Sequence, residues 1–193
     1  MNTGHWNRCL GAVALTALLL VTACAPSPTT PTPVSETLTY TNSEYGYSVE
    51  YPKDWLVEDR FGQQRIQFPG STMFKAPRSP MTRRGVVAIY IMADDFSEEP
   101  EMTLEEYVSQ YDLEWSETRL DYEKVNEHDF VVDGLAGIEW SWKQDVGGMA
   151  FLGTMANFMT DDVGYAIAYF APVEAHDHYF YCFELMLNTF KFD

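Results

Sequence analysis

The sequence has 193 residues, 29 acidic against 12 basic side chains, a net charge of −17 at pH 7 and 15% aromatic residues. A chain this acidic is a poor match for nucleic acid, because phosphates are bound by lysine and arginine. Direct adhesion to an anionic lipid surface is disfavoured for the same reason. The part from residue 38 onward is long enough for one domain with a substantial core.

The N-terminus has the pattern of a targeting segment. Residues 10–21 are an apolar run without charge, and a helix that spans a bilayer needs about 20 residues. The run ends in LVTAC, which resembles the lipobox of bacterial lipoproteins. The resemblance implies removal of residues 1–23 and acylation of Cys24, and an ordinary secretory signal is the alternative. Several acyl chains on Cys24 anchor a protein stably, so we expect it on the extracytoplasmic side of a cell membrane or outer membrane.

Residues 24–37 are expected to form a tether between that anchor and the domain. Four prolines alternate with serine and threonine in this segment, a composition that favours extended chain and cannot build a core. The predicted organisation is therefore a signal peptide at 1–23, a lipidated cysteine with its tether at 24–37, and a single domain at 38–193.

The first part of the domain is predicted to consist of short strands. Residues 38–42, 47–52 and 55–61 have strand composition, and the alternation of Tyr47, Val49 and Tyr51 with polar residues has the period of a strand. Residues 65–68 are a further strand candidate.

A long loop is predicted next, at residues 69–85, which contain three prolines and two glycines. Residues 86–93 are apolar at every position except Tyr90. Such a run indicates a central strand that is covered on both faces.

Two helices are predicted, at residues 102–117 and 173–189. The first has a capping box of Thr103 and Glu106, and Pro172 suits the start of the second. An apolar stripe is expected on the first helix; it consists of Leu104, Val108, Tyr111 and Trp115.

Strands are predicted between the two helices, at residues 137–143, 149–159 and 165–171. In the first of these, Ile138, Trp140 and Trp142 face one side. The order strands, helix, strands, helix favours an α+β fold, with a mostly antiparallel central sheet flanked by helices.

Four segments together resemble PsbP-like domains: EYGYSVEYPKDW at 44–55, TLEEYVSQYDLEWSE at 103–117, VDGLAGIEWSW at 132–142, and YAIAYFAP at 165–172 leading to FELMLNTFKF. The resemblance implies an α/β/α sandwich, similar in fold to the Ran-binding Mog proteins. The best-known members of the family are extrinsic subunits of the photosystem II oxygen-evolving complex, and many bacterial relatives are lipoproteins. Residues 46–55 are therefore interpreted as a fold signature rather than a binding site.

No catalytic sequence motif is present, which predicts a non-enzymatic interaction or assembly module that needs no cofactor. A hydrolase whose site is assembled from distant residues is an alternative, because catalytic triads are spatial. Cys182 lies among aromatic residues at helical spacing and is interpreted as a buried apolar cysteine.

Charge is unevenly distributed and suggests a docking element. Residues 60–93 contain no acidic residue, whereas residues 94–129 contain fourteen acids against two bases. A solvated surface is the ordinary interpretation, and a docking surface for a protein partner or membrane complex is the sharper one. The residues predicted to bind the partner are Lys75, Arg78, Arg83 and Arg84.

A divalent metal or small-ligand site is the remaining alternative. His176, Asp177 and His178 supply ligand types suited to zinc or copper. Residues two apart point about 200° apart on a helix, so they share a metal only where the segment is irregular. Acids at a helix N-terminus are the other interpretation of this cluster.

Overall fold

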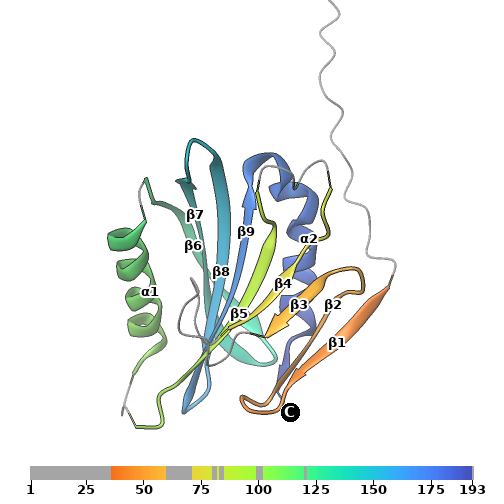
Figure 1. Ribbon diagram of the computed structural model, residues 1–193. Helices are drawn as coiled ribbons and strands as arrows, with labels where there is room; N and C mark the ends of the chain where they lie inside the picture. Colours follow the sequence, from red (N-terminus) through yellow and green to blue (C-terminus); the bar gives the residue numbers. More distant parts are fainter. Residues whose placement is uncertain are drawn as a thin grey trace, which may run out of the picture.

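A seven-stranded antiparallel sheet is the centre of the computed structural model, which describes residues 36–59, 71–79, 82, 85–98, 102–119 and 121–192. The strand order is β3-β4-β5-β9-β8-β7-β6 (Figure 1). The strands are β3 (Leu56–Asp59), β4 (Ser71–Lys75), β5 (Ala88–Asp95), β6 (Glu123–Val132), β7 (Leu135–Asp145), β8 (Ala150–Met159) and β9 (Val163–Pro172).

A smaller sheet has the order β1-β2-β10. Its strands are β1 (Thr37–Asn42), β2 (Tyr47–Pro52) and β10 (Lys191–Phe192). Strand β2 lies in the middle and pairs antiparallel with both neighbours. The first and last described segments of the chain therefore meet on one strand.

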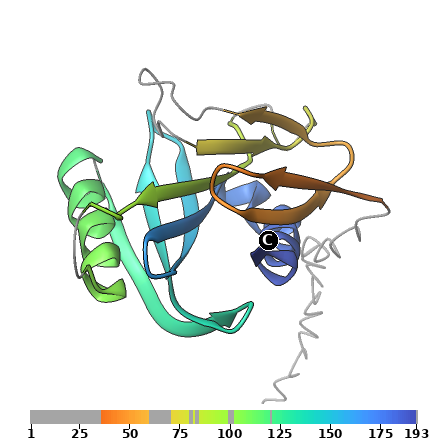
Figure 2. The same cartoon turned by 90° about the horizontal axis from the view of Figure 1, so that it is seen from below.

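The two helices cover opposite faces of the large sheet (Figure 2). Helix α1 (Leu104–Thr118) contacts β7 and β8, and helix α2 (Val173–Thr189) contacts β8, β9 and β2. The layers are helix, sheet, helix, with the small sheet beside α2. This arrangement confirms the predicted α+β class with a mostly antiparallel sheet flanked by helices.

Side chains alternate between two cores, because successive residues of a strand point to opposite faces. In β4, Met73 belongs to the core under α1 and Phe74 to the core under α2. The core under α1 holds Trp115, Trp140 and Trp142. The indole rings of Trp115 and Trp142 meet edge to face with centroids 4.5 Å apart.

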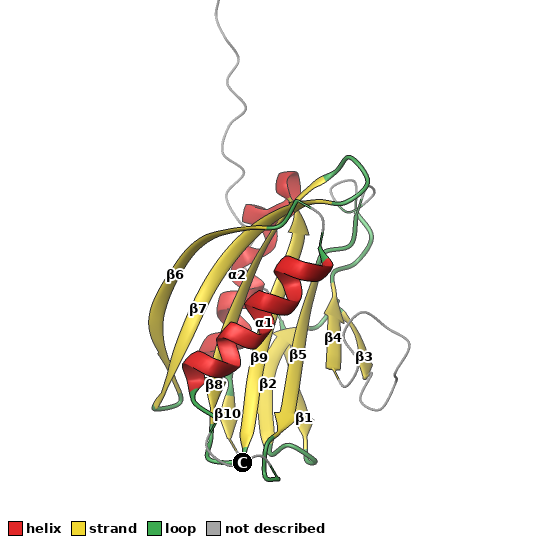
Figure 3. Cartoon of the chain, turned by 90° about the vertical axis from the view of Figure 1, so that its left-hand side faces the viewer, coloured by secondary structure: helices red, strands yellow, loops and turns green. Residues whose placement is uncertain are grey.

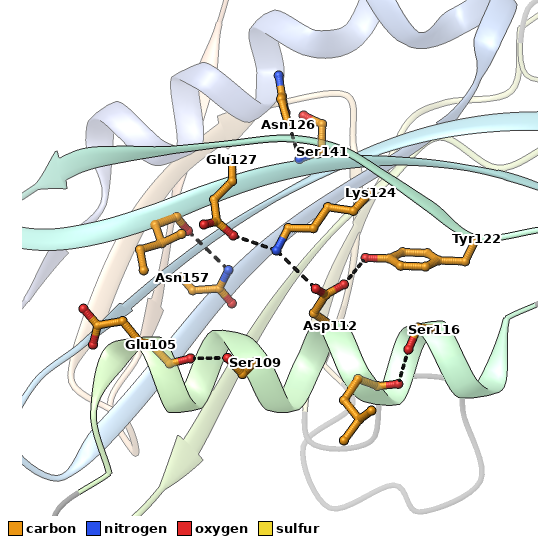
Figure 4. A network of polar contacts seen from close by, with 12 residues as sticks. Glu105, Ser109, Asp112, Ser116, Tyr122, Lys124, Asn126, Glu127, Ser141 and Asn157 are labelled. Carbon is orange, nitrogen blue, oxygen red and sulfur yellow. Dashed lines mark hydrogen bonds and ion pairs between the residues drawn. The ribbon is translucent and has the colours of Figure 1, made fainter.

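Helix α1 begins at the predicted capping box, in which Glu106 N–H donates to Thr103 Oγ1 and Thr103 N–H donates to Glu106 Oε2. Its middle is tied to β6 and the segment before it by a polar network that lies between the helix and the strands (Figure 4). Asp112 accepts a 2.7 Å hydrogen bond from Tyr122 and pairs with Lys124 at 3.2 Å. Figure 3 shows α1 lying across the face of the sheet.

The aromatic residues of 46–55 are core residues, as the sequence predicts. Tyr47, Val49 and Trp55 are buried in the core under α2, and Tyr51 packs against it. The Tyr47 ring stacks on Phe190, with centroids 5.2 Å apart. These aromatic residues join the small sheet to α2.

The predicted loop at residues 69–85 is wrong in its first part, because Ser71–Lys75 is strand β4. The strand lies between β3 and β5 in the sheet, and its side chains are buried on both faces. It therefore lacks the polar alternation of a half-exposed strand. Its prolines and glycines lie at the flanks rather than inside it. The candidate strand at 65–68, the signal segment and nearly all of the tether lie outside the described residues.

Candidate binding site

Part of the α1 side of the sheet lies beside the helix, over β4, β5 and β9. The register of five neighbouring strands places one residue from each in a row across this face. In the order β7, β8, β9, β5, β4 these residues are Trp142, Gly153, Phe170, Ala88 and Lys75. Directly paired residues point to the same face. Lys75 therefore projects on the same side as the tryptophans under α1.

The small residues in this row make room for the large ones. A Cβ atom at Gly153 would overlap the six-membered ring of Trp142, so the indole occupies the space that a side chain on β8 would fill. Ala88 separates Phe170 from Lys75 in the same way. A hollow lies along this row, and Trp142, Phe170 and Lys75 line it.

That hollow is a pocket of about 300 Å³, here called the α1 pocket. Its size is at the lower end of the range for small-molecule sites. Aromatic rings form much of its wall, and Phe151 stacks on Phe170 with centroids 4.5 Å apart. The described lining residues are Met73, Lys75, Val86, Tyr90, Trp115, Arg119, Trp142, Phe151, Ala168 and Phe170.

Two cations, Lys75 and Arg119, line the α1 pocket. The Arg119 guanidinium carbon lies 3.9 Å from the centroid of the Trp115 ring, and its Nη1 donates a 3.3 Å hydrogen bond to Gln144 Oε1. Burial lowers the pKa of Arg119, and the nearby charge of Glu114 acts in the opposite direction. Among the described lining residues there is no carboxylate, so the pocket favours an anion.

A second hollow of about 440 Å³, here called the loop hollow, lies beside the α1 pocket and shares Lys75 and Val86 with it. It is formed by the connection between β4 and β5, which is closed by a hydrogen bond from Ala76 N–H to Val87 O at 3.0 Å. The described lining residues are Lys75, Ala76, Arg78, Ser79, Thr82, Gly85, Val86 and Val87.

Ser79 and Thr82 fold the connection on itself. Ser79 N–H donates to Thr82 Oγ1 at 2.7 Å, and Thr82 N–H donates to Ser79 Oγ at 3.2 Å. The Ser79 hydroxyl also lies 3.3 Å from the hydroxyl of Tyr179 on α2. The loop hollow is therefore held by its own hydrogen bonds and by a contact with a helix.

Two of the four predicted partner-binding residues, Lys75 and Arg78, line the loop hollow together. Lys75 is half-buried and Arg78 is exposed, and neither forms an ion pair with any described residue. Arg83 and Arg84 lie outside the described residues. The partner-binding assignment stays a prediction, and the structure adds Arg119, which sequence analysis did not single out.

The predicted metal residues lie in the first turns of α2, which is a regular helix from Val173 to Thr189. The irregular geometry that His176 and His178 need in order to share a metal is therefore not present. His176 Nδ1 pairs with Asp177 Oδ1 at 3.0 Å, and its ring stacks on Phe180. Among the described residues, no group of three histidine, cysteine or acidic side chains is placed to hold a metal, so the metal site stays an unsupported prediction.

Cys182 is fully buried in the core under α2, and burial raises the pKa of its thiol to about 12. A thiol with a raised pKa is a poor nucleophile at neutral pH. None of the three imidazole rings in the described segments is hydrogen bonded to a hydroxyl or a thiol; the hydroxyl of Tyr169 donates to the backbone carbonyl of His176. The described contacts thus offer no nucleophile beside a histidine base.

Solved structures with the same layers and topology exist at low sequence identity. The solution structure of cyanobacterial PsbP (CyanoP) from Synechocystis sp. PCC 6803 is 13% identical, covers 90% of this chain and 99% of that chain, and has a TM-score of 0.59. The chain has the PsbP-like fold. No protein-family model and no curated protein sequence matches it.

Two further PsbP-like structures match over most of the domain. The Saccharomyces cerevisiae Ran-binding protein Mog1p is 9% identical, with 81% and 95% of the two chains covered and a TM-score of 0.55. LpqN of Mycobacterium tuberculosis, involved in cell envelope biogenesis, is 8% identical, with 81% and 90% covered and a TM-score of 0.55. Neither described helix of this PsbP-like domain has the length and apolar character needed to cross a membrane.

Proposed function

We propose that this chain is a non-enzymatic interaction module whose basic loop docks on an acidic surface of a partner protein. The observation that carries the proposal is the loop hollow. Lys75 and Arg78 line it without an acidic neighbour among the described lining residues, in a chain with 29 acids and 12 bases. Complementary charge of this kind steers association and selects partners.

The fold neighbours support a binding role rather than a catalytic one. Mog1p is a Ran-binding protein, and LpqN takes part in cell envelope biogenesis. A shared fold alone does not transfer a partner. The two neighbours support the class of function, and the basic loop supports the surface that performs it.

The proposal includes a membrane anchor. Acyl chains on Cys24 would hold the protein to the extracytoplasmic side of a membrane, and residues 24–37 would let the domain reach a membrane-bound partner. The support for this part is the sequence pattern LVTAC and the proline-rich segment that follows it.

The test is crosslinking and capture of the full chain from its native membrane. The wild type is compared with a variant in which Lys75, Arg78, Arg83 and Arg84 are each replaced by glutamate. We expect the wild type to retain one protein at a near-stoichiometric level, and the charge-reversed variant to lose it by ten-fold or more. Salt should weaken the wild-type capture, because exposed charges are screened within about 10 Å at 0.1 M.

Lys191→Glu is the matched control, since Lys191 is exposed in β10. It should leave capture unchanged. Retention of the partner by the charge-reversed variant would contradict the docking surface. Cys24→Ser tests the anchor separately, and an unchanged membrane fraction for this variant would contradict the acylation.

A further inference from the structure

Apart from Lys75 and Val86, the described residues that line the α1 pocket are not part of the loop hollow. The α1 pocket lies on the face of the sheet that carries α1, and aromatic rings line it. Its cations are Lys75, at the end of β4, and Arg119, at the end of α1. Sites for small molecules are mostly apolar, with a few charged groups that fix orientation.

The aromatic wall favours a flat ring as the apolar part of a ligand. Phe151 and Phe170 form one stacked pair, and Trp115 and Trp142 form one edge-to-face pair. All four line the same pocket. Aromatic rings prefer offset-stacked and edge-to-face neighbours, and the pocket offers both.

The two cations favour a carboxylate as the polar part. Lys75 forms no ion pair with a described residue, although it is half-buried. The guanidinium of Arg119 is already held over the Trp115 ring and by its hydrogen bond to Gln144. A guanidinium that is fixed in this way loses little freedom when it binds a carboxylate.

A third donor belongs to Trp142, which also lines the pocket. The indole N–H of Trp142 is buried without an acceptor among the described residues. Buried donors are almost always paired. An acceptor that enters from the pocket is a direct way to satisfy this group.

We infer that the α1 pocket binds a small aromatic carboxylate, with its ring between the Phe151–Phe170 and Trp115–Trp142 pairs and its carboxylate between Lys75 and Arg119. This site is separate from the proposed docking surface, apart from the shared Lys75 and Val86.

The test is calorimetric titration of the full chain with 3-phenylpropanoate. Two probes of nearly the same shape isolate the two parts of the inference: 3-phenylpropanamide lacks the charge, and 3-cyclohexylpropanoate lacks the aromatic ring. We expect the aromatic acid to bind roughly ten-fold tighter than the amide, because hydrogen bonds to charged groups are the strong ones. The cyclohexyl acid should bind a few-fold more weakly than the aromatic acid.

Two variants locate the site. Lys75→Met keeps the length of the side chain and removes the charge, and it should reduce affinity for the aromatic acid about ten-fold without changing affinity for the amide. Val86→Trp should plug the pocket and abolish binding. Val86 is 43% exposed, so the larger side chain does not need to enter the core.

The matched controls are Lys191→Met and Val131→Trp, at exposed positions on β10 and β6; both should bind like the wild type. No binding of the aromatic acid at several millimolar to a folded wild-type chain would overturn the inference. Equal affinity for acid and amide, or unchanged binding in a folded Val86→Trp variant, would also overturn it. Because these probes need no protein partner, the result is independent of the capture experiment.

Discussion

Asp94 is the residue that fastens α1 to the central strand β5. Its Oδ2 atom accepts hydrogen bonds from the hydroxyls of Tyr107 at 2.8 Å and Tyr111 at 2.7 Å. Tyr107 is fully buried, and a buried hydroxyl that loses its partner costs free energy. One carboxylate therefore accepts hydrogen bonds from two tyrosines on consecutive turns of the helix.

Replacing Asp94 with alanine should lower the free energy of unfolding by about 2–3 kcal/mol, measured by urea denaturation at pH 7. The neighbouring Asp95 is a matched control, because it is exposed and its side chain accepts a hydrogen bond from Ser97 N–H. Asp95→Ala should cost less than about 0.5 kcal/mol. Equal losses for the two variants would contradict the role assigned to Asp94.

At the scale of the element, the capping box defines where α1 starts. Thr103→Ala removes the acceptor of the Glu106 N–H and should lower the free energy of unfolding by about 1 kcal/mol. Ser109→Ala is the control within the same helix: Ser109 is exposed and donates only to the carbonyl of Glu105. That change should be neutral within about 0.5 kcal/mol in the same denaturation measurement. A neutral Thr103→Ala would show that water replaces the cap.

Elements with a strong local signal could be predicted from the sequence. Helix α2 has its predicted bounds, Val173–Thr189, because Pro172 and the apolar spacing both act locally. Strand β4 was missed because both of its faces are buried, with Met73 in the core under α1 and Phe74 in the core under α2, which removes the polar alternation. Strand β10 has two residues and exists only through pairing with β2, which no local pattern reveals.

The candidate sites could be predicted only in part for the same reason. The basic segment was visible as a charge pattern, and it contains Lys75 and Arg78. Arg119 is one of two bases in the acidic segment that follows, yet only the packing of α1 brings it to the pocket that Lys75 also lines. The position of the Trp142 ring depends on Gly153 in the adjacent strand, where a side chain would overlap the indole.

At the scale of the whole molecule, buried tyrosines should make the folded state less stable at alkaline pH. Burial raises the pKa of Tyr47, Tyr107 and Tyr169 well above the ordinary value near 10. Below pH 10, the folded and unfolded chains both keep these protons, so the full stability is present. Above pH 10, the unfolded chain loses protons that the folded chain retains, and unfolding becomes more favourable.

The free energy of unfolding should therefore fall by about 1.4 kcal/mol per pH unit for each such tyrosine above pH 10. Urea denaturation between pH 8 and pH 11 (roughly one unit beyond the ordinary tyrosine pKa) measures this slope. Tyr47→Phe should make this slope less steep by about 1.4 kcal/mol per pH unit, the contribution of one proton. This change is expected whatever the variant does to the free energy of unfolding at pH 7. A slope unchanged by this variant would contradict the assignment of Tyr47.

The position of β10 has a consequence for the order in which the chain folds. Strand β2 pairs with Lys191 and Phe192, and its Glu50 N–H donates to Thr189 Oγ1 across 139 positions of sequence. Contacts at such separation form late, because a long loop must first close. A chain still emerging from the ribosome can assemble β7, β8 and β9, but β2 must wait for the last residues of the described chain before it acquires its second neighbour.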